Sequence, residues 1–174
     1  HQVYPNLIEA YRHAGQIQQA IDCSRSALQL TDQIPEIWAA YGDALRDGGY
    51  LDAAIEAYIQ AVSFRTDEHS SFNRKVYTNI LFCLNYHPDL SAEVIFNAYR
   101  DFDQRFAVQL KDRWLPFNNA KLPGKRLKIG YVCQSFYNQV CKYFLIPLLE
   151  KHDRAQVEIF AYAQIPFEDE VTEK

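Results

Sequence analysis

The feature that most constrains the fold of this chain is an internal repeat of 34 residues at its beginning. A repeat of this length forms one supersecondary unit that buries its apolar face by stacking on its neighbours. Residues 1–34 align with residues 35–68 without a gap, and they are identical at Ala10/Ala44, Arg12/Arg46, Gly15/Gly49, Ala20/Ala54, Ile21/Ile55 and Ala27/Ala61. The first part of the chain is therefore expected to contain two stacked copies of one unit.

Each copy is expected to be a hairpin of two helices. Tyr4, Leu7 and Tyr11 are spaced by three and four residues, which places their large side chains on one helical face. Gly15 is expected to end the first helix in a left-handed conformation, because a residue without Cβ adopts it at little cost. Ala20 is small enough to let the second helix cross the first closely. This period and pattern resemble the tetratricopeptide repeat.

The concave side of such a stack is lined by the first helix of each hairpin. As a set, the polar side chains at these positions favour a groove that holds an extended protein or peptide segment by bonding its backbone. For any single one of them, a solvated helical face is the favoured interpretation. The candidate groove residues are Asn6, Glu9, Arg12, His13, Ala40, Asp43, Arg46 and Asp47.

Two further helices are expected after the repeats. The apolar spacing predicts a helix over residues 71–84 that stops before Pro88, because the residue before a proline is biased away from the helical conformation. Ser91 is expected to cap a second, amphipathic helix that runs to about Leu110. His87 is interpreted as a turn residue that bonds nearby backbone, and a role as ligand or base is the alternative.

The last third of the sequence predicts a strand–helix–strand unit. Residues 111–125 lose the helical periodicity and contain prolines, asparagines and a glycine, which predicts a linker. β-prone segments at residues 127–132 and 157–162 flank a segment of helical length at residues 140–152. This order is typical of the βαβ unit of a parallel sheet.

Composition argues against several classes of function. Eighteen Lys and Arg residues against 22 Asp and Glu residues give a formal charge of −4, which offers no electrostatic basis for binding nucleic acid. No run of about 18 apolar residues occurs, so a membrane-spanning helix is not expected. The four cysteines lack the spacing of a zinc site, and no bound metal is expected. Free thiols in a reducing, cytoplasmic compartment are the favoured interpretation, with a redox pair of Cys133 and Cys141 as the alternative.

Several later segments resemble the protein O-GlcNAc transferases and SPINDLY-type glycosyltransferases. Residues 79–93, NILFCLNYHPDLSAE, resemble the junction between repeats and enzyme in bacterial members. Residues 126–132, RLKIGYV, resemble the first strand of the catalytic domain, and the match continues through residues 144–149 and 157–162. The implied fold is mostly α, a tetratricopeptide helical-hairpin solenoid followed by the first βαβ unit of a Rossmann-like α/β glycosyltransferase lobe.

The resemblance also implies a division of the chain. We expect two tetratricopeptide repeats at residues 1–68, a repeat-like helical junction at 69–110, a linker at 111–125 and the incomplete N-terminal part of the catalytic lobe at 126–174. Because the sequence contains no Met and breaks off after the second predicted strand, we expect an excerpt of a longer protein.

In activity, the resemblance implies transfer of a sugar from a nucleotide-sugar donor, UDP-GlcNAc or GDP-fucose, to Ser or Thr of a protein held by the repeats. Asn6 matches the position of an asparagine ladder that grips the substrate backbone, whereas Ala40 does not. The donor is held mainly by a second lobe that this sequence lacks, so the chain alone is expected to be inactive. In the loop after the first strand, relatives carry Asp and His where this chain has Ser135 and Gln139.

This altered loop leaves two explanations open. A glutamine amide cannot take up a proton near neutral pH, so a general-base role at Gln139 is lost. We favour a non-catalytic or chemically altered member that keeps the scaffold, and a different acceptor or donor sugar is the alternative. For the whole chain, the main hypothesis is a fragment of an O-GlcNAc-transferase-like protein, and the alternative is a non-catalytic tetratricopeptide adaptor that binds proteins.

Overall fold

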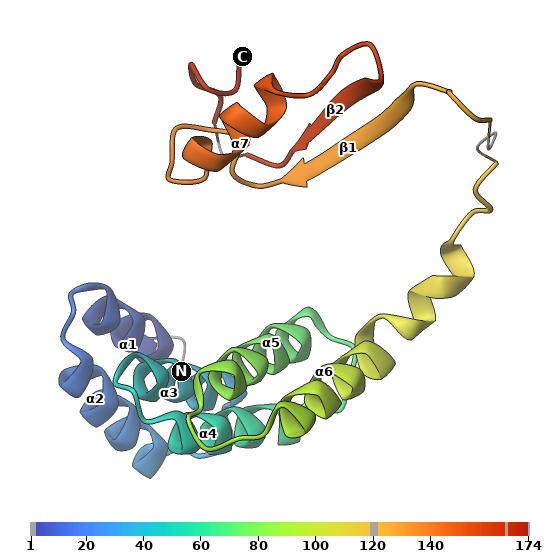
Figure 1. The fold of residues 1–174 in the computed structure, drawn as a ribbon. Helices are drawn as coiled ribbons and strands as arrows, with labels where there is room; N and C mark the ends of the chain where they lie inside the picture. Colours follow the sequence, from blue (N-terminus) through green and yellow to red (C-terminus); the bar gives the residue numbers. More distant parts are fainter. Residues whose placement is uncertain (1–2, 119–121, 166, 174) are drawn as a thin grey trace. The chain divides into compact units, whose positions relative to one another are not determined.

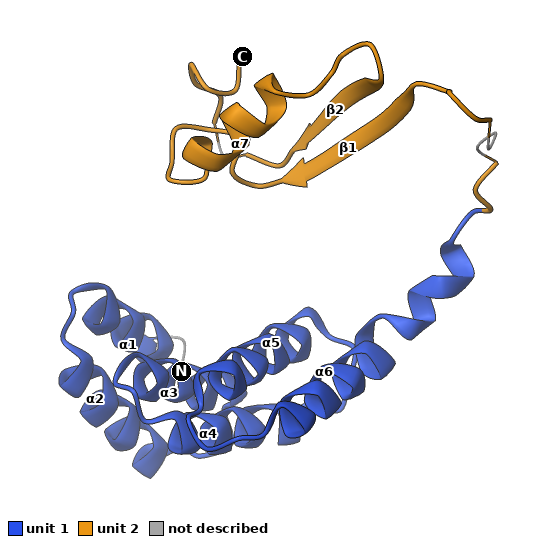
Figure 2. Ribbon diagram, viewed as in Figure 1, with its two compact units in different colours: residues 1–115 blue, residues 116–174 orange. Residues whose placement is uncertain are grey.

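The computed structural model describes residues 3–118, 122–165 and 167–173. The chain divides into two compact units, His1–Leu115 and Pro116–Lys174 (Figure 2). The first is a helical unit and the second is an α/β unit. Residues 119–121 of the predicted linker lie outside the described residues.

The helical unit consists of three successive helical hairpins (Figure 1). Gly15 and Gly49 end the first helix of the first two hairpins with φ angles of 72° and 82°, which confirms the predicted left-handed turns. The repeat therefore folds as the sequence predicted. The α-helices of the three hairpins are α1 (Val3–His13), α2 (Ile17–Leu30), α3 (Pro35–Asp47), α4 (Leu51–Ser63), α5 (Ser71–Tyr86) and α6 (Ala92–Phe106).

Small residues fill the contacts between the helices of the first two hairpins. Ala20 and Ala54, at equivalent positions of the two copies, are completely buried, which confirms the predicted close crossing. Ile8 is also completely buried, and the equivalent residue of the second copy is the buried Gly42. The space that Gly42 leaves is taken by the ring of Tyr58 from α4. The same position of the core is therefore filled by Ile8 of the first helix in the first copy and by Tyr58 of the second helix in the second copy.

The 34-residue spacing continues into α5. Val76 follows Gly42 by 34 residues, as Gly42 follows Ile8, and it too is buried, with 2% exposure. The sequence analysis predicted this helix as part of a repeat-like junction, but it did not extend the 34-residue register into it. Because α5 packs against α4 and α3, it occupies the place of the first helix in a third hairpin.

The ends of α5 and α6 agree closely with the sequence pattern. Helix α5 stops at Tyr86, just before His87 and Pro88, and the Ser91 hydroxyl caps α6 by accepting a hydrogen bond from the Val94 N–H at 3.3 Å. Helix α6 is shorter than predicted. It ends at Phe106, and a 3-10 helix, η1 (Val108–Arg113), runs into the segment predicted as linker. Apolar periodicity does not reveal such a change from i→i+4 to i→i+3 hydrogen bonding.

The α/β unit is a βαβ unit with parallel strands, as predicted. Strand β1 (Leu127–Cys133) pairs in parallel with β2 (Val157–Ala163), and α7 (Lys142–Glu150) connects them. In the register of the pair, Leu127 lies opposite Val157 and Cys133 lies opposite Ala163. Helix α7 is two residues shorter at each end than the segment predicted.

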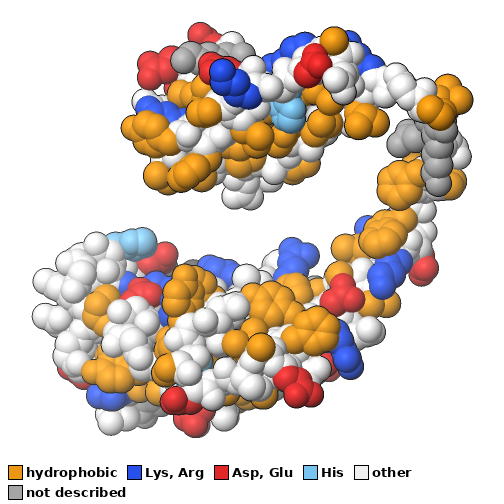
Figure 3. Space-filling model, in the orientation of Figure 1, with side chains coloured by type: hydrophobic (Ala, Val, Ile, Leu, Met, Phe, Trp, Pro, Cys, Tyr) orange, Lys and Arg blue, Asp and Glu red, His pale blue; other side chains and the backbone are white. Residues whose placement is uncertain are grey.

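Exposed hydrophobic side chains are prominent on this small unit (Figure 3). Val132 of β1 is 85% exposed and Phe144 of α7 is 75% exposed. A parallel sheet is normally covered on both faces, and two strands with one helix cannot provide that cover. Within the described residues, no helix has both the length and the apolar content that crossing a bilayer requires.

Candidate functional site

The first helices of the three hairpins line one groove of about 230 Å³ in the helical unit. Helices α1, α3 and α5 each contribute three or more side chains to it. Four of the candidate residues line this groove, namely Glu9, Arg12, Ala40 and Asp43. The lining set does not include Asn6, His13, Arg46 and Asp47. Side chains from α5 complete the groove, including Phe72, Lys75, Val76 and Asn79.

Four of the candidate residues pair with one another. Arg12 contacts Asp47 at 2.7 Å and Asp43 at 3.4 Å, and Arg46 contacts Asp43 at 3.2 Å and Asp47 at 2.9 Å. Their side chains are only 16–29% exposed. The sequence interpretation treated them as concave side chains free to meet a partner or solvent. In the structure, the two arginines and two carboxylates neutralise each other across α1 and α3.

Asp43 joins this ion-pair network to two further helices. Its Oδ1 accepts hydrogen bonds from the Tyr58 hydroxyl of α4 at 2.6 Å and from Asn79 Nδ2 of α5 at 3.0 Å. Burial raises the pKa of the Tyr58 hydroxyl, and the adjacent Asp43 carboxylate raises it further, so Tyr58 acts as a donor here. One carboxylate therefore ties together helices from all three hairpins, and this fixes the wall of the groove.

The network makes the stability of the helical unit depend on pH. Partial burial alone would raise the pKa of Asp47, but hydrogen bonds from Arg12 and Arg46 outweigh it and lower the pKa below its ordinary value near 4. A carboxylate with a depressed pKa in the folded state stabilises that state fully above its unfolded pKa. The stabilisation is lost as the pH falls through the folded pKa.

We therefore expect the urea midpoint of the chain to fall as the pH drops below about 4. Asp47→Asn should flatten this acid dependence, because the amide carries no titratable proton. The measurement is urea unfolding followed by circular dichroism at several pH values. An unchanged acid slope in Asp47→Asn would contradict the assignment.

The structure confirms the interpretation of His87 as a turn residue. Its Nδ1 accepts a hydrogen bond from the Asp89 backbone N–H at 3.2 Å. In addition, its Nε2 lies 2.9 Å from Asp52 of α4, a contact that the sequence did not predict. Because Nδ1 is the acceptor, the proton of the neutral imidazole is on Nε2. His87 therefore fixes the turn between α5 and α6 onto α4.

The loop between β1 and α7 carries Ser135 and Gln139, the two positions at which the sequence differs from the family that it resembles. Ser135 lines a cavity of about 620 Å³ in the α/β unit, whereas Gln139 is not among its lining residues. The C-terminal segment holds the loop in place: the Asn138 N–H donates to Asp169 at 2.6 Å, and the Thr172 hydroxyl donates to the Phe136 carbonyl at 2.7 Å. The Gln139 carbonyl accepts from the backbone N–H at the start of α7.

The four cysteines are free. Burial raises the pKa of the Cys83 thiol and of the Cys23 thiol, so both are poor nucleophiles. Cys133 and Cys141 are half-buried and lie in the α/β unit. Among the described residues, no group of three or more His, Cys, Asp or Glu side chains is arranged to hold a metal ion.

Comparison with known proteins gives distant relatives of one kind. No family model matches the chain. The probable UDP-N-acetylglucosamine–peptide N-acetylglucosaminyltransferase SPINDLY of Solanum lycopersicum is 27% identical over 102 residues, which is 59% of this chain and 11% of that protein. The SPINDLY protein of Oryza sativa subsp. japonica is 25% identical over 111 residues, which is 64% of this chain and 11% of that protein.

A solved structure extends the likeness to nearly the whole chain. A mutant of the Thermobaculum terrenum O-GlcNAc transferase matches with a TM-score of 0.72 and 24% identity, covering 96% of this chain and 31% of that one. The match shows that helical hairpins followed by a βαβ unit occur in the same order in both. The chain spans 11% of the length of the curated relatives named above.

Proposed function

Because this chain is related to the O-GlcNAc transferase and SPINDLY family, we propose that its helical unit binds an extended peptide segment of a protein destined for glycosylation. The groove lined by α1, α3 and α5 is the site. In the whole protein, the bound segment would be presented to a lobe that transfers a sugar from a nucleotide-sugar to Ser or Thr. The names of the SPINDLY relatives give UDP-GlcNAc as their donor, and GDP-fucose is the alternative donor for the whole protein.

The observation that carries this proposal is the groove itself. It is built from the first helices of three consecutive hairpins, and its middle is lined by the small residues Ala39 and Ala40. Small side chains between longer ones leave room for the backbone of another chain to approach. The ion-pair network in its wall supplies rigidity, which lowers the entropy lost when a ligand binds.

Sugar transfer is not proposed for this chain by itself. At the loop after β1, Gln139 cannot act as a base, and Ser135 provides no carboxylate. These two residues favour, as a second candidate function, a non-catalytic adaptor that uses the same groove to bind proteins. A reducing compartment such as the cytoplasm is part of either proposal, since all four cysteines carry free thiols.

Peptide binding can be tested on the 174-residue chain. A phage-displayed library of short peptides is selected on the protein, and enriched peptides are remade with a fluorophore for anisotropy titrations. Ala40→Trp fills the middle of the groove and should weaken binding at least tenfold. Gln60→Trp, on an exposed position of α4 outside the groove lining, is the matched control and should bind as the unaltered chain does.

Two results would contradict the proposal. One is the failure of any peptide to be enriched over a resin control. The other is equal affinity of Ala40→Trp and the unaltered chain, because binding would then lie elsewhere on the molecule. Thermal unfolding of both variants by circular dichroism establishes that any loss of binding occurs in a folded protein.

A further inference from the structure

The groove carries five charged side chains, and they differ in how far their charge is already neutralised. Arg12 and Asp43 belong to the ion-pair network and are each at most 20% exposed. Glu36 forms an ion pair with Arg65, whose guanidinium also stacks over the Phe72 ring at 4.7 Å. Arg12 and Asp43 therefore have little charge left to offer a ligand. Glu36 is 46% exposed, but the arginine that pairs with it is itself held over Phe72, so Glu36 has a cation of the chain beside it.

The two remaining groove charges have weaker partners or none. Glu9, on α1, is 61% exposed, and its one ion pair with the described residues is with His13, one turn further along the same helix, at 3.5 Å. Exposed pairs of this kind contribute little. Lys75, on α5, is exposed, and it forms no ion pair within the described part of the chain. The groove therefore offers one available negative charge and one available positive charge.

These two charges lie on opposite sides of the groove. Helix α3 packs against both α1 and α5 and lies between them (Figure 1). Glu9 therefore stands at the α1 side and Lys75 at the α5 side, with the small side chains Ala39 and Ala40 between them. A ligand that crosses the groove meets a carboxylate first, then a small apolar floor, then an ammonium group.

The spacing of the helix axes sets an upper limit on the separation of the two charges along a ligand. Packed helices lie about 8–10 Å apart, so α1 and α5 are separated by roughly 16–20 Å across α3. An extended chain advances about 3.3 Å per residue, so about five or six residues of peptide span this distance. Complementary charges at that spacing could meet Glu9 and Lys75 at the same time.

We propose that the groove selects an extended peptide with a basic side chain facing Glu9 and an acidic side chain about five residues away facing Lys75. This inference rests on the peptide-binding function proposed above and adds the chemistry of its ligand. Charge complementarity of this kind chooses among ligands more than it adds to affinity, because like charges at either side are repelled.

The experiment compares four peptides that share one neutral backbone sequence and differ at two positions five residues apart. The pairs are Arg with Glu, Arg with Arg, Glu with Glu, and Gln with Gln. For the unaltered chain, we expect the mixed Arg/Glu peptide to bind about threefold to tenfold more tightly than either like-charged peptide. This preference should shrink at high salt, since the contacts are exposed.

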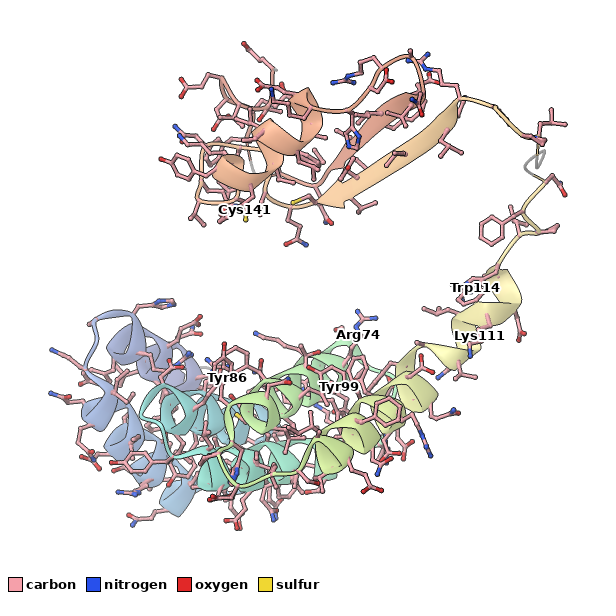
Figure 4. All side chains as sticks on the ribbon, in the orientation of Figure 1. Arg74, Tyr86, Tyr99, Lys111, Trp114 and Cys141 are labelled. Carbon is pink, nitrogen blue, oxygen red and sulfur yellow. The ribbon has the colours of Figure 1, made fainter. Side chains whose placement is uncertain are left out.

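Two charge reversals give opposite expected results. Lys75→Glu makes both sides of the groove acidic and should shift the preference to the Arg/Arg peptide. Glu9→Lys makes both sides basic and should shift it to the Glu/Glu peptide. Lys111→Glu, on the exposed 3-10 helix η1 outside the groove lining (Figure 4), is the matched control and should keep the preference for the mixed peptide.

Failure of this inference can be told apart from failure of the proposed function. If both reversals leave the order of the four peptides unchanged, Glu9 and Lys75 do not select the ligand, and the inference is overturned. In that case, if the Gln/Gln peptide binds the unaltered chain and Ala40→Trp abolishes this binding, the groove is still supported as the peptide-binding site. If the groove-filling variant leaves the binding of all four peptides unchanged, the proposed function itself fails.

Discussion

Replacing Asp43 by alanine will destabilise the helical unit by about 3 kcal/mol, the largest effect expected of any single substitution considered for this chain. Its carboxylate accepts hydrogen bonds or ion pairs from Arg12, Arg46, Tyr58 and Asn79. Removing it leaves a buried hydroxyl without its acceptor and two poorly exposed guanidinium groups facing each other across the remaining Asp47. Urea unfolding followed by far-ultraviolet circular dichroism measures the loss.

Asp22 provides the matched control for this substitution. It pairs with Arg25 at 3.6 Å, and its side chain is 60% exposed. Exposed ion pairs contribute about 0–1 kcal/mol, so Asp22→Ala should change the free energy of unfolding by less than about 1 kcal/mol. Equal losses in the two variants would show that Asp43 is no more than a surface carboxylate.

Gly42→Ala is expected to destabilise the helical unit by about 2 kcal/mol, even though alanine is the better helix former. A Cβ at this position would lie 2.6 Å from Cε1 and 2.7 Å from Cδ1 of the Tyr58 ring. Tyr58 is completely buried and hydrogen bonded to Asp43, so the ring cannot move aside cheaply. Helix propensity alone predicts a gain of about 1 kcal/mol, so the sign of the change separates the two effects.

A double-mutant cycle isolates the contact responsible. In the Tyr58→Leu background, the shorter side chain leaves room for the added methyl group, and Gly42→Ala should cost much less than it does in the unaltered chain. Stabilisation by Gly42→Ala in the unaltered chain would show that the helices separate there without cost. The same unfolding measurements serve for all members of the cycle.

Local sequence signals were sufficient to predict the helices and strands and the residues at which several of them begin or end. Gly15, Pro88 and Ser91 act through the backbone conformation or hydrogen bond of their immediate neighbours, so their effects can be predicted without knowing what packs on them. The end of α6 is the exception. There the hydrogen bonding changes at Phe106 although the apolar pattern continues, and a period of side chains does not report that change.

The candidate groove residues show what such signals leave undecided. Repeat position placed Arg12, Asp43, Arg46 and Asp47 near one another on the first helices, but it could not distinguish a free side chain from a paired one. For Arg12, that distinction depends on contacts with Asp43 and Asp47, which lie 31 and 35 residues away along the chain, and the position of Asp43 depends in turn on Tyr58 and Asn79. The place of Lys75 in the groove lining was missed for the same reason: its helix was predicted, but α5 was not recognised as a third wall of the groove.

The sequence by itself determined the hairpin repeat, the turn residues and the strand–helix–strand order, because periodicity and backbone preferences act over a few residues. Only the tertiary structure decided that Arg12 of α1 is neutralised by Asp43 and Asp47 of α3, because an ion pair between two helices forms only where their packing brings both partners within a few ångströms. Glu9 and Lys75 keep a charge that a ligand can meet, and the proposed selection of a peptide depends on that difference.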